Sequence, residues 1–219
     1  MIQIINTGVA NIRSLQAAFD RLNQPWNLTE DANAIANAKH VVLPGVGAIA
    51  AAAESLDRLN LRDVIRQRLM DPHKSTLCIC LGMQLLFDAS EESDTAKGLG
   101  VVSSIIKKFP DDVPVPQLGW NQVTVARQDQ SGWVPYPTGE AYFANSFRLV
   151  DIPPSDWGYA ETDYGGKFLS SIWRGRTLAC QFHPELSGQW GRAVLESWIN
   201  AEPMDDLDNG DSKEGTIEC

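Results

Sequence analysis

The sequence lacks the features that mark membrane, secreted and nucleic-acid-binding proteins. No apolar run approaches the eighteen or more residues that a membrane-spanning helix needs. The first residues lack the basic segment and long apolar stretch of a secretory signal. Basic residues are nowhere clustered enough to follow a phosphate backbone. We therefore expect a cytoplasmic protein that binds neither a membrane nor nucleic acid.

Cysteine and histidine are both scarce. The chain of 219 residues contains four cysteines and three histidines. So few cysteines in a long chain with an ordinary content of hydrophobic residues argue against a disulfide framework. The thiols are therefore expected to be catalytic or simply buried. We expect the protein to use no metal and no cofactor.

The negative charge is concentrated at the C-terminus. Residues 201–219 contain seven acidic residues and one lysine, so they carry six of the ten net negative charges. A segment with so few apolar residues cannot bury enough surface to offset the entropy lost on ordering. We expect residues 1–200 to form one catalytic domain and residues 201–219 to be a disordered tail.

The first third of the chain alternates short apolar runs with helical patterns. The apolar runs predict strands at Ile2–Ile5 and at Val41–Leu43, the latter ended by a proline and a glycine. Apolar residues at helical spacing predict helices at 12–22, 48–59 and 61–69. Strands that alternate with helices in this way are typical of a parallel sheet.

The pattern changes after about Leu99. Alternating segments separated by turns with proline and glycine predict antiparallel strands at Gln122–Val125, Tyr142–Val150 and Phe168–Trp173. A last helix is predicted at Gly188–Asn200, where apolar residues recur four apart. The residues therefore predict an α/β fold with a mixed sheet.

Cys80 is the first candidate for a reactive residue. The predicted strand Thr76–Cys80 stops at Gly82, and a helical run, Met83–Ala89, follows. A strand that turns sharply into a helix forms a nucleophile elbow, and the N-terminus of the helix favours the thiolate. The alternative is that Cys78 and Cys80 are both small, buried strand residues. The turn favours Cys80 as a nucleophile.

His183 and Glu185 are candidates for the base and the group that orients it. Residues two apart in an extended segment point to the same face, so the carboxylate can reach the imidazole and fix its tautomer. The other histidines, His40 and His73, lie near the start of an apolar strand and beside a proline. A single histidine is more often structural than catalytic, but the neighbouring carboxylate favours catalysis at His183.

The loop Pro44–Gly47 is a candidate source of oxyanion donors. Two glycines let the backbone approach a substrate and turn an N–H group inward. The amide of Leu81, beside the nucleophile, would supply the second donor. Turns of this composition are common after strands, so the loop is a weak signal by itself.

Five motifs follow one another in the order of a known enzyme family. They are PGVG, CLGMQLLF, GWN, YFANSF and QFHPELSG. Over about residues 1 to 200 this series resembles the class I (triad) glutamine amidotransferases, in particular the glutaminase subunits of imidazole glycerol phosphate synthase. The resemblance implies a flavodoxin-like α/β fold, a three-layer sandwich with a mixed, mainly parallel central sheet and antiparallel hairpins in the second half.

The same resemblance implies a reaction and its residues. The triad Cys80, His183 and Glu185 would hydrolyse L-glutamine to L-glutamate and ammonia through a glutamyl thioester. By the same resemblance, Gln84 and Ser146 would contact the bound glutamine. The oxyanion would be bound by Val46, Gly47 and Leu81. The implied partner, in a heterodimer, is a (β/α)8 barrel cyclase that uses the ammonia to make imidazole glycerol phosphate and aminoimidazole carboxamide ribotide in histidine biosynthesis.

Four residues depart from the family pattern. Cys78 replaces a glycine before the nucleophile, Gln117 and Asn145 each replace a histidine, and Leu186 replaces a basic residue. The last three lie on the side expected to face the partner. Three alternatives therefore stay open: an ammonia-supplying paralogue for another partner such as a surface-sugar amidotransferase, a catalytically silent regulatory subunit, and a cysteine peptidase.

Overall fold

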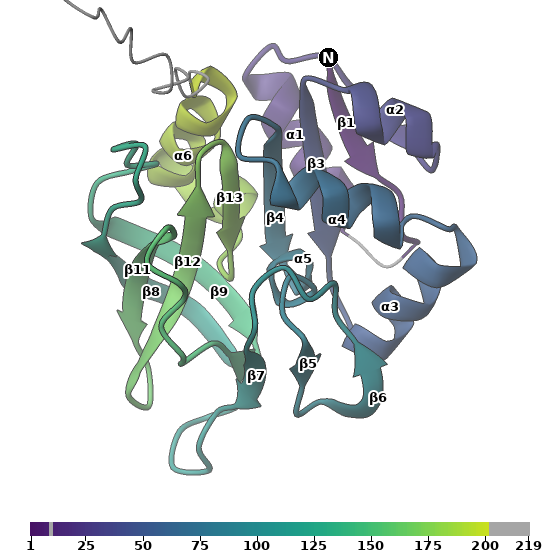
Figure 1. The fold of residues 1–219 in the computed structure, drawn as a ribbon. Coiled ribbons are helices and arrows are strands. Elements are labelled where there is room, and N and C mark those ends of the chain that lie inside the picture. The colour runs from purple at the N-terminus through teal and green to yellow at the C-terminus, as the bar shows by residue number, and fades with distance from the viewer. Residues whose placement is uncertain (9–10, 202–219) are drawn as a thin grey trace, which may run out of the picture.

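The computed structural model describes residues 1–8 and 11–201 (Figure 1). The predicted tail therefore lies outside the described residues, apart from Ala201. Among the described residues, no helix has both the length and the apolar character needed to cross a membrane.

The centre of the molecule is a mixed sheet with the strand order β2-β1-β3-β4-β13-β12-β11-β8-β9. Strands from β2 to β13 in this order pair in parallel, and those from β13 to β9 pair antiparallel. The parallel strands are β1 (Ile2–Ile5), β2 (Trp26–Thr29), β3 (His40–Gly45), β4 (Ser75–Cys80) and β13 (Thr177–Cys180). The others are β8 (Gln117–Arg127), β9 (Gly139–Asn145), β11 (Gly158–Asp163) and β12 (Lys167–Arg174).

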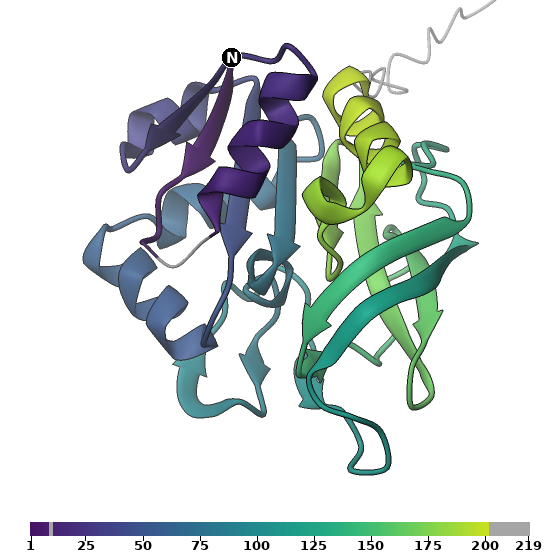
Figure 2. The same ribbon diagram turned by 180° about the vertical axis from the view of Figure 1, so that it is seen from behind.

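Helices cover both faces of the parallel strands. Three of them, α2, α3 and α4, lie on the face seen in Figure 1, whereas α1 and α6 lie on the face seen in Figure 2. Their bounds are α1 (Ile12–Arg21), α2 (Ala32–Asn37), α3 (Ile49–Arg58), α4 (Arg62–Met70) and α6 (Gly188–Asn200). The predicted three-layer α/β sandwich is confirmed.

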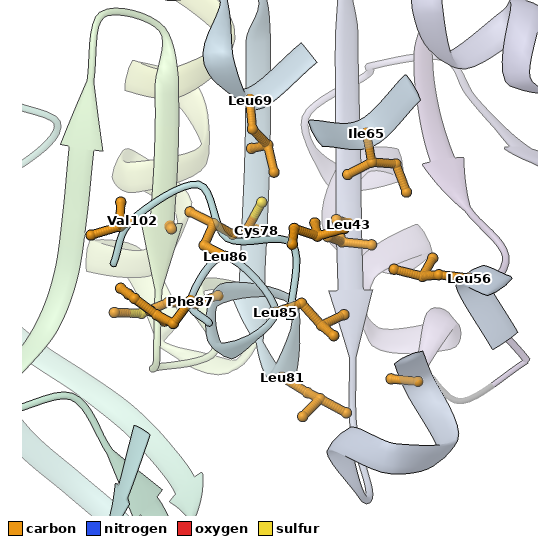
Figure 3. Close-up of a cluster of buried hydrophobic side chains, with 14 of the residues drawn as sticks. Leu43, Leu56, Ile65, Leu69, Cys78, Leu81, Leu85, Leu86, Phe87 and Val102 are labelled. Carbon is orange, nitrogen blue, oxygen red and sulfur yellow. The ribbon is translucent and has the colours of Figure 1, made fainter. Parts of the chain in front are cut away.

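The alternation of side chains along each strand explains the two helical layers. Val42 packs into a cluster with Phe19 of α1 and Trp198 of α6. Its neighbour Leu43 points to the other face and packs into a cluster with Leu56 of α3. Figure 3 shows this second cluster, which also includes residues from the segment after β4. Full burial of each such side chain contributes about 1.5–3 kcal/mol.

The predicted end of β3 at Leu43 is wrong, because the strand continues to Gly45. Pro44 pairs with Ile79 and Gly45 pairs with Cys80. On its other side β3 pairs with β1 only as far as Val42. The missing N–H of proline therefore breaks no hydrogen bond to β1. This extension carries the glycine loop alongside Cys80.

The predicted helix Met83–Ala89 is also wrong. Helix α5 covers only Leu81–Gln84. The carbonyl groups of Leu85 and Leu86 accept from the amides of Leu99 and Val101, so they are not available to continue the helix. The chain instead enters a small second sheet of order β10-β7-β5-β6.

This second sheet also divides one predicted strand. Its members are β5 (Ala89–Ser90), β6 (Ser93–Lys97), β7 (Ile105–Lys108) and β10 (Phe147–Arg148). The strand predicted at Tyr142–Val150 is split at Ser146, because β9 pairs with β8 and β10 pairs with β7. The split places Ser146 at the junction of the two sheets, next to the candidate site.

Candidate active site

Cys80 lies at a sharp bend between β4 and α5. Its backbone has φ 53° and ψ −110°, a conformation that residues other than glycine rarely adopt. Glycine is required two residues later, because a Cβ on Gly82 would lie 2.0 Å from the carbonyl oxygen of Leu43. The close approach of α5 to β3 therefore requires glycine at position 82, and the bend at Cys80 has the geometry expected of the predicted nucleophile elbow.

His183 and Glu185 form the expected hydrogen-bonded pair. His183 Nδ1 lies 2.9 Å from Glu185 Oε1, and both side chains are buried. Glu185 belongs to the short helix η1 (Pro184–Leu186). The backbone of His183 is held by two further bonds, to the carbonyl oxygen of Tyr142 and from the hydroxyl of Ser187. With Nδ1 bound to the carboxylate, Nε2 is the nitrogen left for another partner.

The electrostatics of His183 link it to Cys80. Burial lowers the pKa of the imidazole, but hydrogen bonds to Cys80 and Glu185, together with their negative charges, outweigh burial and raise the pKa from 6.5 to about 10. Cys80 and His183 also line the same cavity. An imidazolium held between a sulfur and a carboxylate can return a proton to a leaving group.

A single cavity of about 260 Å³ joins the predicted residues. The sequence-predicted residues that line it are Val46, Gly47, Cys80, Leu81, Gln84, Ser146 and His183. Glu185 supports His183 without being among the lining residues. In residues 1–8 and 11–201 no group of three or more His, Cys, Asp or Glu side chains is arranged to hold a metal ion.

The glycine loop after β3 forms part of the cavity wall. Gly47 has φ +89°, a conformation that favours glycine. Val46 and Gly47 line the cavity together with Leu81, whose amide follows Cys80. The oxyanion role of these three residues stays a prediction from the sequence.

Comparison with known proteins identifies the family. Residues 3–200 match the family model described as glutamine amidotransferase class-I. The chain belongs to this family. The resemblance drawn from the five motifs is therefore confirmed.

The relatives of this class I amidotransferase include imidazole glycerol phosphate synthase proteins. The HisH subunit of Dehalococcoides mccartyi (strain CBDB1) is 36% identical over 91% of this chain and 96% of its own length. The chloroplastic hisHF protein of Arabidopsis thaliana is 34% identical over 91% of this chain, which spans only 34% of that longer protein. A solved glutamine amidotransferase matches with a TM-score of 0.70 at 16% identity, covering 90% of this chain and 98% of its own, which supports the fold alone.

The other thiols of the amidotransferase domain are unsuited to catalysis. Cys78 and Cys180 have no solvent-exposed surface. Burial raises the pKa of the Cys78 thiol. Burial, followed by the charges of Glu185 and the neighbouring sulfurs, raises the pKa of Cys180. Of Cys78, Cys80 and Cys180, only Cys80 lines the cavity.

Two polar residues of the amidotransferase cavity were missed as site residues by sequence reasoning. Glu92, in the turn between β5 and β6, lines the cavity, and its Oε2 accepts a hydrogen bond from the Ile49 amide at 3.2 Å. Asn145 lines it too, and its Oδ1 has no hydrogen-bond partner among the described residues. No local sequence pattern marks Glu92 as a site residue. Asn145 is marked in the segment YFANSF only as a departure from the family pattern.

Proposed function

We propose that this chain is the cytoplasmic glutaminase subunit of an imidazole glycerol phosphate synthase in histidine biosynthesis. It hydrolyses L-glutamine to L-glutamate and ammonia through Cys80, His183 and Glu185. The observation that carries the proposal is the meeting of an elbow cysteine and a carboxylate-bound histidine in one cavity. The HisH relatives supply the choice of pathway.

The reaction proceeds in two halves. The Cys80 sulfur attacks the carbon of the side-chain amide, and the oxygen becomes an oxyanion that backbone N–H groups near Gly47 and Leu81 stabilise. His183 gives its proton to the departing nitrogen, so ammonia leaves and a glutamyl thioester remains. His183 then takes a proton from water, which attacks the thioester and releases glutamate. Glu185 holds the imidazole in the tautomer that both steps need.

The polar lining of the cavity suits a small amino acid. Glutamine carries an ammonium group that requires acceptors, and a carboxylate is the strongest acceptor for it. Glu92 presents such a carboxylate, and the unpartnered Asn145 oxygen presents another acceptor. Gln84 and Ser146 complete the proposed substrate contacts.

We propose that the ammonia-accepting partner, a (β/α)8 cyclase, binds an exposed apolar surface beside the active site. This docking patch consists of Leu118, Trp120 and Leu186, which are 65%, 53% and 39% exposed. The Trp120 ring contacts the ring of Tyr142, whose carbonyl oxygen accepts from the His183 amide. Aromatic side chains such as that of Trp120 are enriched at protein interfaces. A partner docked here would lie next to the site of ammonia release.

The departures at Gln117, Asn145 and Leu186 favour one second candidate, an ammonia-supplying paralogue with a different acceptor. The two functions share the chemistry at Cys80 and differ only in the protein that binds the docking patch. Stimulation of glutamate release by an imidazole glycerol phosphate cyclase supports the first function. Stimulation only by another acceptor, such as a surface-sugar amidotransferase, supports the second.

The experiment compares two cysteine variants in the presence of the cyclase. Cys80→Ala is expected to abolish glutamine-dependent product formation while ammonium salts still support the partner's reaction. The matched control is Cys78→Ala, which removes a buried thiol outside the cavity and is expected to keep glutamine-dependent activity. Full activity in Cys80→Ala, or loss of both glutamine- and ammonia-dependent activity, contradicts the proposal. A wild-type chain inactive with every acceptor supports a regulatory subunit.

A further inference from the structure

Gln181 is a buried residue that links two members of the active site. It follows β13 directly, precedes His183 by two positions and is 1% exposed. Its side-chain Nε2 donates to the sulfur of Cys80 at 3.5 Å. Its Oε1 accepts from Nε2 of Gln84 at 2.9 Å. The three side chains form a continuous hydrogen-bonded chain that ends at the sulfur.

The position of Gln181 follows from its place in the chain. Its backbone amide donates to the carbonyl oxygen of Ser170 at 2.8 Å, which fixes the segment against β12. His183 lies two residues further along this segment and lines the cavity together with Cys80. Gln181 and His183 therefore approach the Cys80 sulfur from the same segment.

The hydrogen bond from Gln84 pairs the oxygen of the Gln181 amide and leaves its NH₂ group facing the sulfur. If that amide were turned over, its oxygen would face the sulfur and its NH₂ group would face the NH₂ group of Gln84. With Gln84 in its observed orientation, both contacts would be unfavourable, because oxygen would face a thiolate and one NH₂ group would face another. The observed orientation instead directs an N–H group at the sulfur, and hydrogen bonds to ionised groups are stronger than those to neutral ones.

We infer that Gln181 is a positioning residue that holds the Cys80 sulfur and stabilises it as a thiolate through its side-chain N–H group. The inference deepens the proposed function and rests on it, because it assigns the group that prepares the nucleophile. His183 supplies the proton that must move, whereas the Gln181 amide supplies a donor that keeps its proton. Gln84 takes part indirectly by orienting Gln181.

The test is the pH dependence of alkylation of Cys80 by iodoacetamide, measured on the full chain without glutamine or partner. Peptide mapping assigns the modified residue, and Cys80→Ala provides the blank. Gln181→Glu keeps the acceptor for Gln84 and replaces the donor to sulfur with an oxygen. Gln181→Met has a similar length and offers no donor, so it tests the same bond without adding charge.

Loss of a donor to a thiolate is expected to slow alkylation about tenfold or more at neutral pH. In both variants the pH of half-maximal rate is expected to rise by about one unit or more, while the plateau rate at high pH is retained. An unchanged pH profile, or an equal loss of rate at every pH, overturns the inference. If wild-type Cys80 is not alkylated at neutral pH, the proposed nucleophile itself fails, so the two failures are distinguishable.

Discussion

The two halves of the central sheet contribute different parts of the active site. The parallel strands are covered by helices on both faces, and the carboxyl ends of β3 and β4 lead into the Gly47 loop and Cys80. The antiparallel strands have a more open face, where Leu118 and Trp120 are exposed, and β9 ends at Asn145 in the cavity wall. The buried half thus positions Cys80, the proposed nucleophile, and one part of the cavity wall, whereas the open half supplies another part of the wall and the proposed docking patch.

The strand β13 joins these two halves. It pairs in parallel with β4 and antiparallel with β12. The residues that follow it are Gln181 and His183, which both act on Cys80 in our account. The proton-transfer group therefore enters the site at the place where the strand direction changes, with the nucleophile on the neighbouring strand.

The largest effect is expected from removing the base that β13 supplies. His183→Gln is expected to lower kcat for glutamine about 10³-fold with little change in KM, because proton transfer to the leaving ammonia is lost. The matched variant in the open half, Asn145→Ala, is expected to raise KM about tenfold and leave kcat nearly unchanged. Steady-state glutaminase assays with the partner measure both values. A change mainly in KM for His183→Gln and mainly in kcat for Asn145→Ala would contradict the comparison.

The second prediction concerns the stability of the elbow. Gly82→Ala is expected to destabilise the fold by about 3 kcal/mol or more, because the new Cβ meets the Leu43 carbonyl oxygen in a tightly packed region. The control variant is Gly132→Ala. Gly132 lies in a loop after β8, where φ is +71° and no atom crowds the new Cβ. That variant is expected to cost about 1 kcal/mol. Urea unfolding followed by fluorescence measures both, and equal losses would contradict the account.

The third prediction tests the docking patch on the open half. Trp120→Ala is expected to weaken binding of the cyclase about 10- to 100-fold, since an aromatic side chain at the centre of an interface often dominates its affinity. Ile152→Ala is the matched control, because Ile152 is 64% exposed and lies outside the patch. Titration calorimetry gives both affinities. If the Ile152 variant weakens binding as much as the Trp120 variant, the patch is misplaced.

The smallest effect concerns His40, at the other end of the parallel strands from the active site. Burial, followed by the charges of Lys39 and Arg176, lowers the pKa of His40 from 6.5 to about 4. As pH falls below 6.5, the unfolded chain binds a proton that the folded chain does not, so the stability of the fold decreases. Between pH 7 and pH 5 this contributes a loss of about 1 to 2 kcal/mol.

The control for this prediction is His40→Gln, which keeps a polar group near the hydroxyl of Ser75 that His40 contacts at 2.9 Å. Its stability is expected to change less between pH 7 and pH 5 than that of the wild type. Thermal melts at several pH values measure the difference. If stability depends on pH equally in the wild type and in His40→Gln, His40 is not the group that causes the loss of stability.

Elements with strong local signals were predicted well from the sequence. The first strand, Ile2–Ile5, and the last helix, Gly188–Asn200, have the predicted bounds because an apolar pattern and turn residues define each one. The helix predicted at Met83–Ala89 failed because carbonyl groups there bond to residues more than ten positions away. Local periodicity carries no signal for such bonds.

The same distinction applies to the candidate site. The sequence marks Cys80 as a candidate because a strand and a glycine define the elbow, and it marks His183 as a candidate because Glu185 stands two residues away. Glu92 was missed because its position depends on a turn that packs against the start of α3, 43 residues earlier in the chain. Gln181 lay in a recognised motif, but its bond to the sulfur depends on how β13 and β4 pair.

The central claim is that Cys80 is the nucleophile that attacks the side-chain amide of glutamine. The most direct measurement is labelling with the glutamine-like electrophile diazo-oxo-norleucine in the presence of the partner, followed by peptide mapping. The account predicts one label at Cys80, suppressed by excess glutamine and absent in Cys80→Ala. Label at Cys78 or Cys180, or an unmodified chain with the partner bound, would contradict it.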